Sequence, residues 1–171
     1  EAIAIAAGEV HAVGTDEELA ELAPLARRVI DLGGRRALPG LIDSHIHAVR
    51  AGVSWSVSLH WEGVRSVAEA LRTIADRAAR LPAGSWIPVI GGWHRRQFAE
   101  GRPPTPAELT AAAPEHPVYV QETYDSGFLN AAGLAACACS GADAEDPPRG
   151  RLERDADGVP TGVLLGVGAF A

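Results

Sequence analysis

Two histidines separated by one residue, His45 and His47, follow a short apolar run that starts with a Pro-Gly pair. The run predicts a strand over residues 41–47, in which alternate side chains share a face, so both imidazoles would point the same way. Strand rise would place their Cα atoms about 6.5 to 7 Å apart. Both rings could then bind one ion at a metal–nitrogen distance of about 2.0–2.1 Å. The spacing therefore predicts a site for a divalent metal ion, with zinc as the expected ion.

A metal ion held by neutral imidazoles would supply hydrolytic chemistry. The ion keeps its positive charge and lowers the pKa of a bound water toward about 7. Such a water can attack a carbonyl carbon while the ion polarises the carbonyl oxygen. Asp43 would share the strand face with His45. It is either a buried polar residue that bonds neighbouring backbone or the group that orients a ligand histidine.

The rest of the chain must position these residues, and its pattern indicates an α/β fold. Apolar alternation and turn residues predict strands over residues 2–5, 9–13, 28–32, 41–47, 86–90, 117–122, 151–154 and 159–165. Helical periodicity predicts helices over residues 16–22, 67–81, 106–113 and 128–139. Capping boxes formed by Ser66 with Glu69 and by Thr105 with Glu108 fix the starts of the second and third helices.

The stretch 38–48 resembles the signature of the metal-dependent amidohydrolase superfamily. The likeness continues in segments 8–14, 28–35, 92–93, 102–105, 116–121 and 129–132. These segments are similar to amidohydrolase family 3, in the branch that includes N-substituted formamide deformylase-like enzymes. The resemblance implies a (β/α)8 TIM barrel preceded by a small β-sandwich domain. Residues 1–38 would be part of the sandwich, 39–50 the first barrel strand, and 51–171 a mixed α/β insertion with the start of the remaining barrel.

The same resemblance implies a hydrolase that cleaves carbon–nitrogen bonds of a small amide, formamide or cyclic amide through metal-activated water. It also implies ligands beyond His45 and His47: two more histidines, often a carboxylated lysine, and an aspartate that acts as base after the eighth strand. The chain has no lysine, and no catalytic residue is assigned in it. Because a barrel alone needs about 250 residues, we expect an amino-proximal fragment that is inactive by itself, rather than a processed, self-standing small domain.

Insertions after the first strand border the substrate pocket in the enzymes that the chain resembles. The side chains that we expect as pocket walls are Trp93, His94, Phe98, Tyr124 and Phe128. Ordinary packing in the core is the alternative for each. Where this family often has a histidine before the helix asparagine, the chain has residues 122–127 without one. Asn130 is therefore expected to organise the start of its helix rather than to contact substrate.

Composition gives no indication of a nucleic-acid or membrane partner. The net charge is -7 and the basic residues, all arginine, are scattered, which gives no footprint for nucleic acid. No apolar run reaches the roughly 18 residues of a membrane span, so we expect a cytoplasmic protein of unspecified oligomeric state. Cys137 and Cys139 are expected to be small buried residues. The histidines at positions 11, 60, 94 and 116 are not expected to bind metal.

Two other functions remain compatible with the sequence. A binding module could retain the amidohydrolase fold without the remaining ligands. A small self-folding domain could use His45 and His47 together with Cys137 and Cys139 to bind a structural metal ion. Histidines on later barrel strands and a terminal aspartate would indicate catalysis, whereas apolar residues at those positions would indicate the binding module.

Overall fold

The structure, a computed structural model, describes residues 1–166 and divides into two compact units, with the boundary along the chain between Ile46 and His47. In the first unit, β1 (Ala2–Ala6) and β2 (Glu9–Gly14) form an antiparallel hairpin with a register shift after Ala4. A 3-10 helix, η1 (Ala20–Leu25), follows. Every residue of this unit is at least partly exposed. The two strands confirm the predictions for residues 2–5 and 9–13.

Three predictions for the first 47 residues are wrong. A turn occupies residues 16–19, so the predicted helix over 16–22 is replaced by η1, which begins later and includes Pro24. Residues 28–32 and 41–47 are irregular rather than extended strands. A strand needs a neighbour to pair its backbone N–H and C=O groups. None of the strands described in residues 1–166 pairs with either segment.

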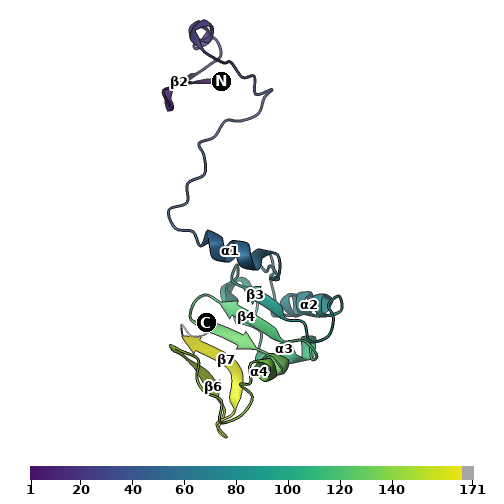
Figure 1. The fold of residues 1–171 in the computed structure, drawn as a ribbon. Helices are drawn as coiled ribbons and strands as arrows, with labels where there is room; N and C mark the ends of the chain where they lie inside the picture. The colour runs from purple at the N-terminus through teal and green to yellow at the C-terminus, as the bar shows by residue number, and fades with distance from the viewer. Residues whose placement is uncertain (167–171) are drawn as a thin grey trace. The chain divides into compact units, whose positions relative to one another are not determined.

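A five-stranded mixed sheet forms the second unit (Figure 1). Its strands, in spatial order, are β3 (Ile87–Ile90), β4 (Val118–Glu122), β5 (Ser126–Leu129), β7 (Pro160–Gly166) and β6 (Gly150–Arg154). The β3–β4 pair is parallel, and the other three pairs are antiparallel. The strands predicted at 86–90, 117–122, 151–154 and 159–165 are confirmed. The mixture of strands and helices confirms the α/β class.

The helices of this unit are α1 (Ala48–Trp55), α2 (Val67–Ala78), η2 (Arg95–Gln97), α3 (Pro106–Ala112) and α4 (Ala131–Ala136). Helix α2 begins where Ser66 Oγ accepts a hydrogen bond from the Glu69 backbone at 3.1 Å. Helix α3 begins with a complete capping box between Thr105 and Glu108. Both helix starts confirm the sequence prediction. None of the helices described in residues 1–166 is long and apolar enough to cross a bilayer.

The core lies between the sheet and helices α2 and α3. The parallel pair contributes the alternate residues Ile87, Val89, Val118 and Val120, all at most 1% exposed. Helix α2 covers them with Val67, Ala70 and Ile74, and α3 adds Leu109. This burial is the main source of the unit's stability, because removal of apolar surface from water is the dominant favourable term in folding.

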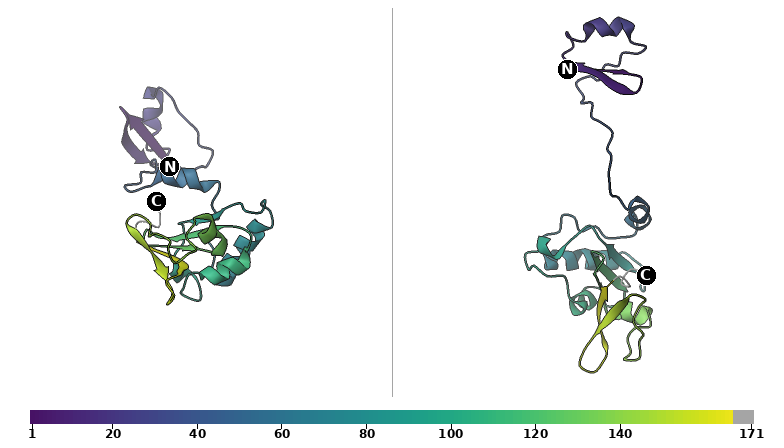
Figure 2. Two further views of the ribbon diagram at one scale, coloured as in Figure 1. Left: turned by 60° about the horizontal axis from the view of Figure 1, so that its bottom comes forward. Right: turned by 90° about the vertical axis from the view of Figure 1, so that its left-hand side faces the viewer.

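Both edges of the sheet are occupied by strands suited to an edge position. Pro88 lies in β3, where its missing N–H removes no bond to an inner strand. Backbone N of Leu59 donates to Pro88 O at 2.8 Å, and Ser58 Oγ accepts from Ile90 N at 2.9 Å, so residues 58–59 cover that edge. At the other edge, β6 forms a hairpin with β7, drawn in yellow in Figure 2.

The structure differs from the prediction in two further segments. Residues 49–62, where no helix is predicted, begin with most of α1. The predicted helix over 128–139 is instead the end of β5 followed by the short helix α4. Strand β5 pairs with β4 on one side and β7 on the other. Its backbone groups are therefore bonded across the sheet, and the helix begins only after Asn130, at Ala131.

Candidate functional site

The two motif histidines are exposed and lie on either side of the boundary between the units. His45 is the penultimate residue of the first unit, and His47 precedes α1 in the second. Asp43 is also exposed, and its Oδ1 accepts a hydrogen bond from the backbone N of His45 at 2.9 Å. Asp43 thus bonds neighbouring backbone, as one of its two predicted roles requires, but it is not buried.

The donor chemistry of these histidines suits a divalent ion, because imidazole nitrogen is a preferred ligand of zinc and related metals. A catalytic zinc site has three protein ligands, and a structural site has four. Among the described residues, 1–166, no group of three or more His, Cys, Asp or Glu side chains could hold a metal ion. The described part of the chain therefore offers two imidazole donors and not a complete ligand set.

Polar residues gather where β3 and β4 end. The strands are parallel and Ile90 pairs with Gln121. The segments that follow the two strands therefore both start at the carboxyl end of the pair. His94 and Arg95 follow β3, while Glu122 ends β4 and Tyr124 lies in the turn after it. In open α/β sheets, ligands bind beyond the carboxyl ends of the strands. These polar side chains therefore lie at the carboxyl end of the parallel strand pair, where ligands bind in sheets of the open α/β type.

Arg95 and Glu122 form an ion pair at the carboxyl ends of β3 and β4. The Glu122 carboxylate is 2% exposed, and it accepts hydrogen bonds from the Arg95 backbone at 2.8 Å and from its Nε at 2.9 Å. Burial raises the pKa of Glu122, but the hydrogen bonds from Arg95 outweigh it, so the pKa lies below its usual value. The hydrogen bond to Glu122 raises the pKa of Arg95. Both groups are therefore charged near neutral pH, and they join the segment after β3 to the end of β4.

Tyr124 lies in the turn that joins β4 to β5, and its side chain contacts His47. The ring centroids of Tyr124 and His47 are 5.8 Å apart, with an angle of 49° between the planes. Tyr124 is 46% exposed. Tyr124, one of the residues predicted as pocket walls, therefore has a ring contact with a motif histidine. Its prediction as a pocket wall rested on its place in the insertion after the first predicted barrel strand.

The other predicted pocket residues divide between core and surface. Trp93, Phe98 and Phe128 are buried, so packing in the core describes their environment. Trp93 stacks on Phe98 with 5.3 Å between ring centroids, and its Nε1 donates to the Gln121 carbonyl at 2.9 Å. His94 is exposed, and its Nδ1 accepts a hydrogen bond from the Arg96 backbone at 3.1 Å.

The cysteines are not buried as predicted. Cys137 is exposed and Cys139 half-buried. Ala138 between them has φ 55°, which turns the chain sharply after α4 and brings both residues to the surface. The Cys139 thiol donates to the carbonyl of Cys137 at 3.2 Å. Both are free thiols at the end of a short helix.

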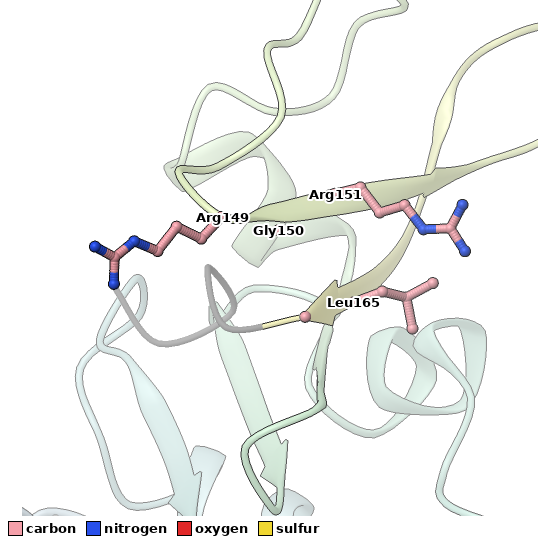
Figure 3. A pocket seen from close by; sticks show the side chains of 5 residues that line it. Arg149, Gly150, Arg151 and Leu165 are labelled. Atoms are coloured by element: carbon pink, nitrogen blue, oxygen red, sulfur yellow. The ribbon is translucent and has the colours of Figure 1, made fainter.

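A shallow pocket lies elsewhere, at one end of the β6–β7 hairpin. Its lining residues are Arg149, Gly150, Arg151, Leu165 and Gly166. The side chains of Arg149 and Arg151 point in opposite directions, as Figure 3 shows. Two guanidinium groups arranged in this way do not converge on one anion. Sequence reasoning did not identify this pocket, and no motif accompanies it.

Residues 28–171 match the model of the amidohydrolase family. The chain is 33% identical over 167 residues to the N-substituted formamide deformylase of Arthrobacter pascens, covering 96% of this chain and 30% of that protein. It is 29% identical to the protein LONG AFTER FAR-RED 3 of Arabidopsis thaliana, and that match covers 96% of this chain and 28% of the plant protein.

A solved structure, of an uncharacterized metal-dependent hydrolase from Pyrococcus horikoshii OT3, matches with 22% identity and a TM-score of 0.48. That match covers 96% of this chain and 30% of the solved one. The chain thus spans less than a third of the length of these proteins.

Proposed function

The chain belongs to the amidohydrolase family, and from this membership we propose that it forms part of a metal-dependent hydrolase acting on non-peptide carbon–nitrogen bonds. The match of residues 28–171 to the family carries the proposal. Similarity to an N-substituted formamide deformylase supports a small amide, formamide or cyclic amide as substrate. The proposed partner is accordingly a small molecule, and the oligomeric state is left open.

His45 and His47 are the residues that would hold the divalent ion, with zinc as the expected ion. When bound, such an ion activates water and polarises a carbonyl group. Asp43 would restrict the backbone before the first ligand, because its carboxylate accepts from the His45 N–H at 2.9 Å. Among the described residues, 1–166, no third His, Cys, Asp or Glu side chain joins these two imidazoles, whereas a catalytic zinc needs three protein ligands. We therefore expect no hydrolysis by this stretch alone.

The proposed domain boundaries are those of the family. Residues 1–38 would belong to a β-sandwich, 39–50 would be the first barrel strand with the metal motif, and 51–171 would form a mixed α/β insertion with the start of the remaining (β/α)8 barrel. The antiparallel hairpin of β1 and β2 supports the first assignment, and the mixed α/β sheet supports the third. A non-catalytic binding module with the same fold is the alternative. The experiment below separates the two.

Metal content and hydrolysis should be measured together on the full-length protein. His45→Ala and His47→Ala should each lose tightly bound metal and turnover of N-substituted formamides, because each removes one ligand. His11→Ala is the matched control, since His11 is an exposed histidine on β2. Metal retained at wild-type stoichiometry in both motif variants would refute the ligand assignment. Bound metal without turnover of any amide would favour the binding module.

A further inference from the structure

The contact between Tyr124 and His47 links the turn between β4 and β5 to the metal motif. We propose that Tyr124 is a positioning residue for His47, a role that rests on the proposed metal-dependent function. The two rings lie 5.8 Å apart at 49°, a separation and tilt typical of a favourable aromatic contact. His47 lies at the start of α1, 77 positions before Tyr124 in the sequence. The contact therefore brings together two segments that are distant along the chain.

The turn that carries Tyr124 has an unusual backbone conformation. Thr123, the residue before it, has φ 52°. This left-handed conformation is a genuine outlier for a β-branched residue. Strain of this kind persists only where surrounding contacts enforce it, and it clusters at functional sites. Here the carbonyl of Thr123 accepts a hydrogen bond from Gln121 Nε2 at 2.9 Å.

Both sides of the turn are fixed to the sheet. Glu122 pairs with Ser126 across the β4–β5 hairpin, and the buried ion pair with Arg95 holds Glu122 from the side. On the other side, the backbone N of Gly166 donates to the Asp125 carbonyl at 2.8 Å. The residues on both sides of Tyr124 are therefore bonded to three neighbouring segments, which fixes the backbone from which its side chain contacts His47.

This arrangement restricts the rotation of the His47 imidazole. A ligand histidine that is already oriented loses less rotational freedom when it binds metal, which raises the affinity. Groups that orient metal-binding histidines typically change metal affinity by about 10–100-fold when they are removed. Because His47 is exposed, the Tyr124 ring provides such restriction in a place where core packing does not.

The contact can be tested without metal by the NMR signals of the His47 ring in histidine-labelled protein, assigned with His47→Gln. Tyr124→Leu should shift these signals by removing the ring current, and Tyr124→Phe should leave them close to their original positions. Trp86→Leu is the matched control, because Trp86 is a comparably exposed aromatic residue at 43%. Unchanged His47 signals in Tyr124→Leu, or an equal shift in Trp86→Leu, would overturn the inference.

Zinc titration of the full-length protein completes the test. Tyr124→Leu should weaken Zn²⁺ binding by about 10-fold or more, and Tyr124→Phe should restore most of the affinity because it keeps the ring. Equal affinity in wild type and Tyr124→Leu would overturn the positioning role. Absence of Zn²⁺ binding in the wild type would instead refute the proposed function, while the His47 signals would still report on the ring contact.

Discussion

The side chain of Asn130 bonds the backbone of Val118: its Oδ1 atom accepts a hydrogen bond from the Val118 N–H at 2.9 Å. The same oxygen accepts from Gly133 N at 2.8 Å, and Nδ2 donates to the carbonyls of Ala113 and His116. Asn130 is fully buried. One amide thus joins the first residue of β4, the end of α3 and the start of α4.

Asn130→Ala should lower the free energy of unfolding by about 4 kcal/mol or more. Four buried backbone groups lose their partner, and each unsatisfied group costs about 1–3 kcal/mol. Urea unfolding followed by tryptophan fluorescence measures the change. Ser66→Ala is the comparison, since Ser66 Oγ caps a helix through one bond to Glu69, and its loss should cost about 1 kcal/mol. Equal losses in the two variants would contradict the bridging role of Asn130.

Trp93→Ala should destabilise the second unit by about 3–5 kcal/mol, the usual cost of removing a buried aromatic side chain. Trp93 is 6% exposed and lies in the core. Trp86→Ala should cost less than 1 kcal/mol, because Trp86 is largely at the surface. Thermal unfolding of both variants checks this difference. If Trp93→Ala unfolded like the wild type, Trp93 would be a surface or pocket residue after all.

The ion pair of Glu108 with Arg102 should make stability depend on pH. Hydrogen bonds from Arg102 lower the pKa of Glu108 to about 2. In an unfolded chain the pKa of glutamate is about 4.3. Ionised Glu108 therefore stabilises the fold above about pH 4.3, and this contribution is lost as the pH falls toward about 2.

Unfolding of wild type and Glu108→Gln across that range measures the effect. The stability difference between them should be largest near neutral pH and should shrink below about pH 4.3. Arg102→Met should abolish most of this pH dependence, because it removes the main cause of the lowered pKa. A difference that stayed constant down to about pH 2 would show that Glu108 acts only as a neutral helix cap.

Gly162→Ala should be much more costly than Gly158→Ala. Both glycines have positive φ, 97° and 79°, where an added Cβ costs roughly 1–2 kcal/mol. At Gly158 the new Cβ would meet open space. At Gly162 it would lie 2.9 Å from Pro106 Cβ and closer still to the Leu129 carbonyl oxygen. We expect an additional loss of about 1–3 kcal/mol, measured by urea unfolding, and similar losses at the two sites would contradict this packing.

Sequence reasoning succeeded where the signal is local. The starts of α2 and α3 follow from Ser66 and Thr105, because a capping residue satisfies backbone groups within its own turn. It failed at β5, since Thr123 gives no glycine or asparagine signal for a left-handed turn and the small residues after Phe128 suit a helix. The pairing of β5 with β4 and β7 is a long-range choice.

The candidate site was only partly predictable for the same reason. The type and spacing of His45 and His47 identified the metal motif, but the predicted strand over 41–47 depends on neighbours that its own residues cannot encode. Trp93 and Tyr124 are both aromatic residues near turns, yet one is buried in the core and the other contacts His47. The ion pair of Arg95 with Glu122 joins residues 27 positions apart and has no local signal.

The two outer strands of the sheet also bear on aggregation. Exposed β-strand edges are templates on which identical chains can stack into fibrils. Residues 58–59 occupy part of the β3 rim, and Arg151 and Arg154 place charge along β6. A second chain that pairs with the sheet would have to displace residues 58–59 from the β3 edge or remove water from the arginines of β6. Replacing the exposed Arg151 with valine should therefore speed amyloid formation, as followed by thioflavin fluorescence, without altering the core.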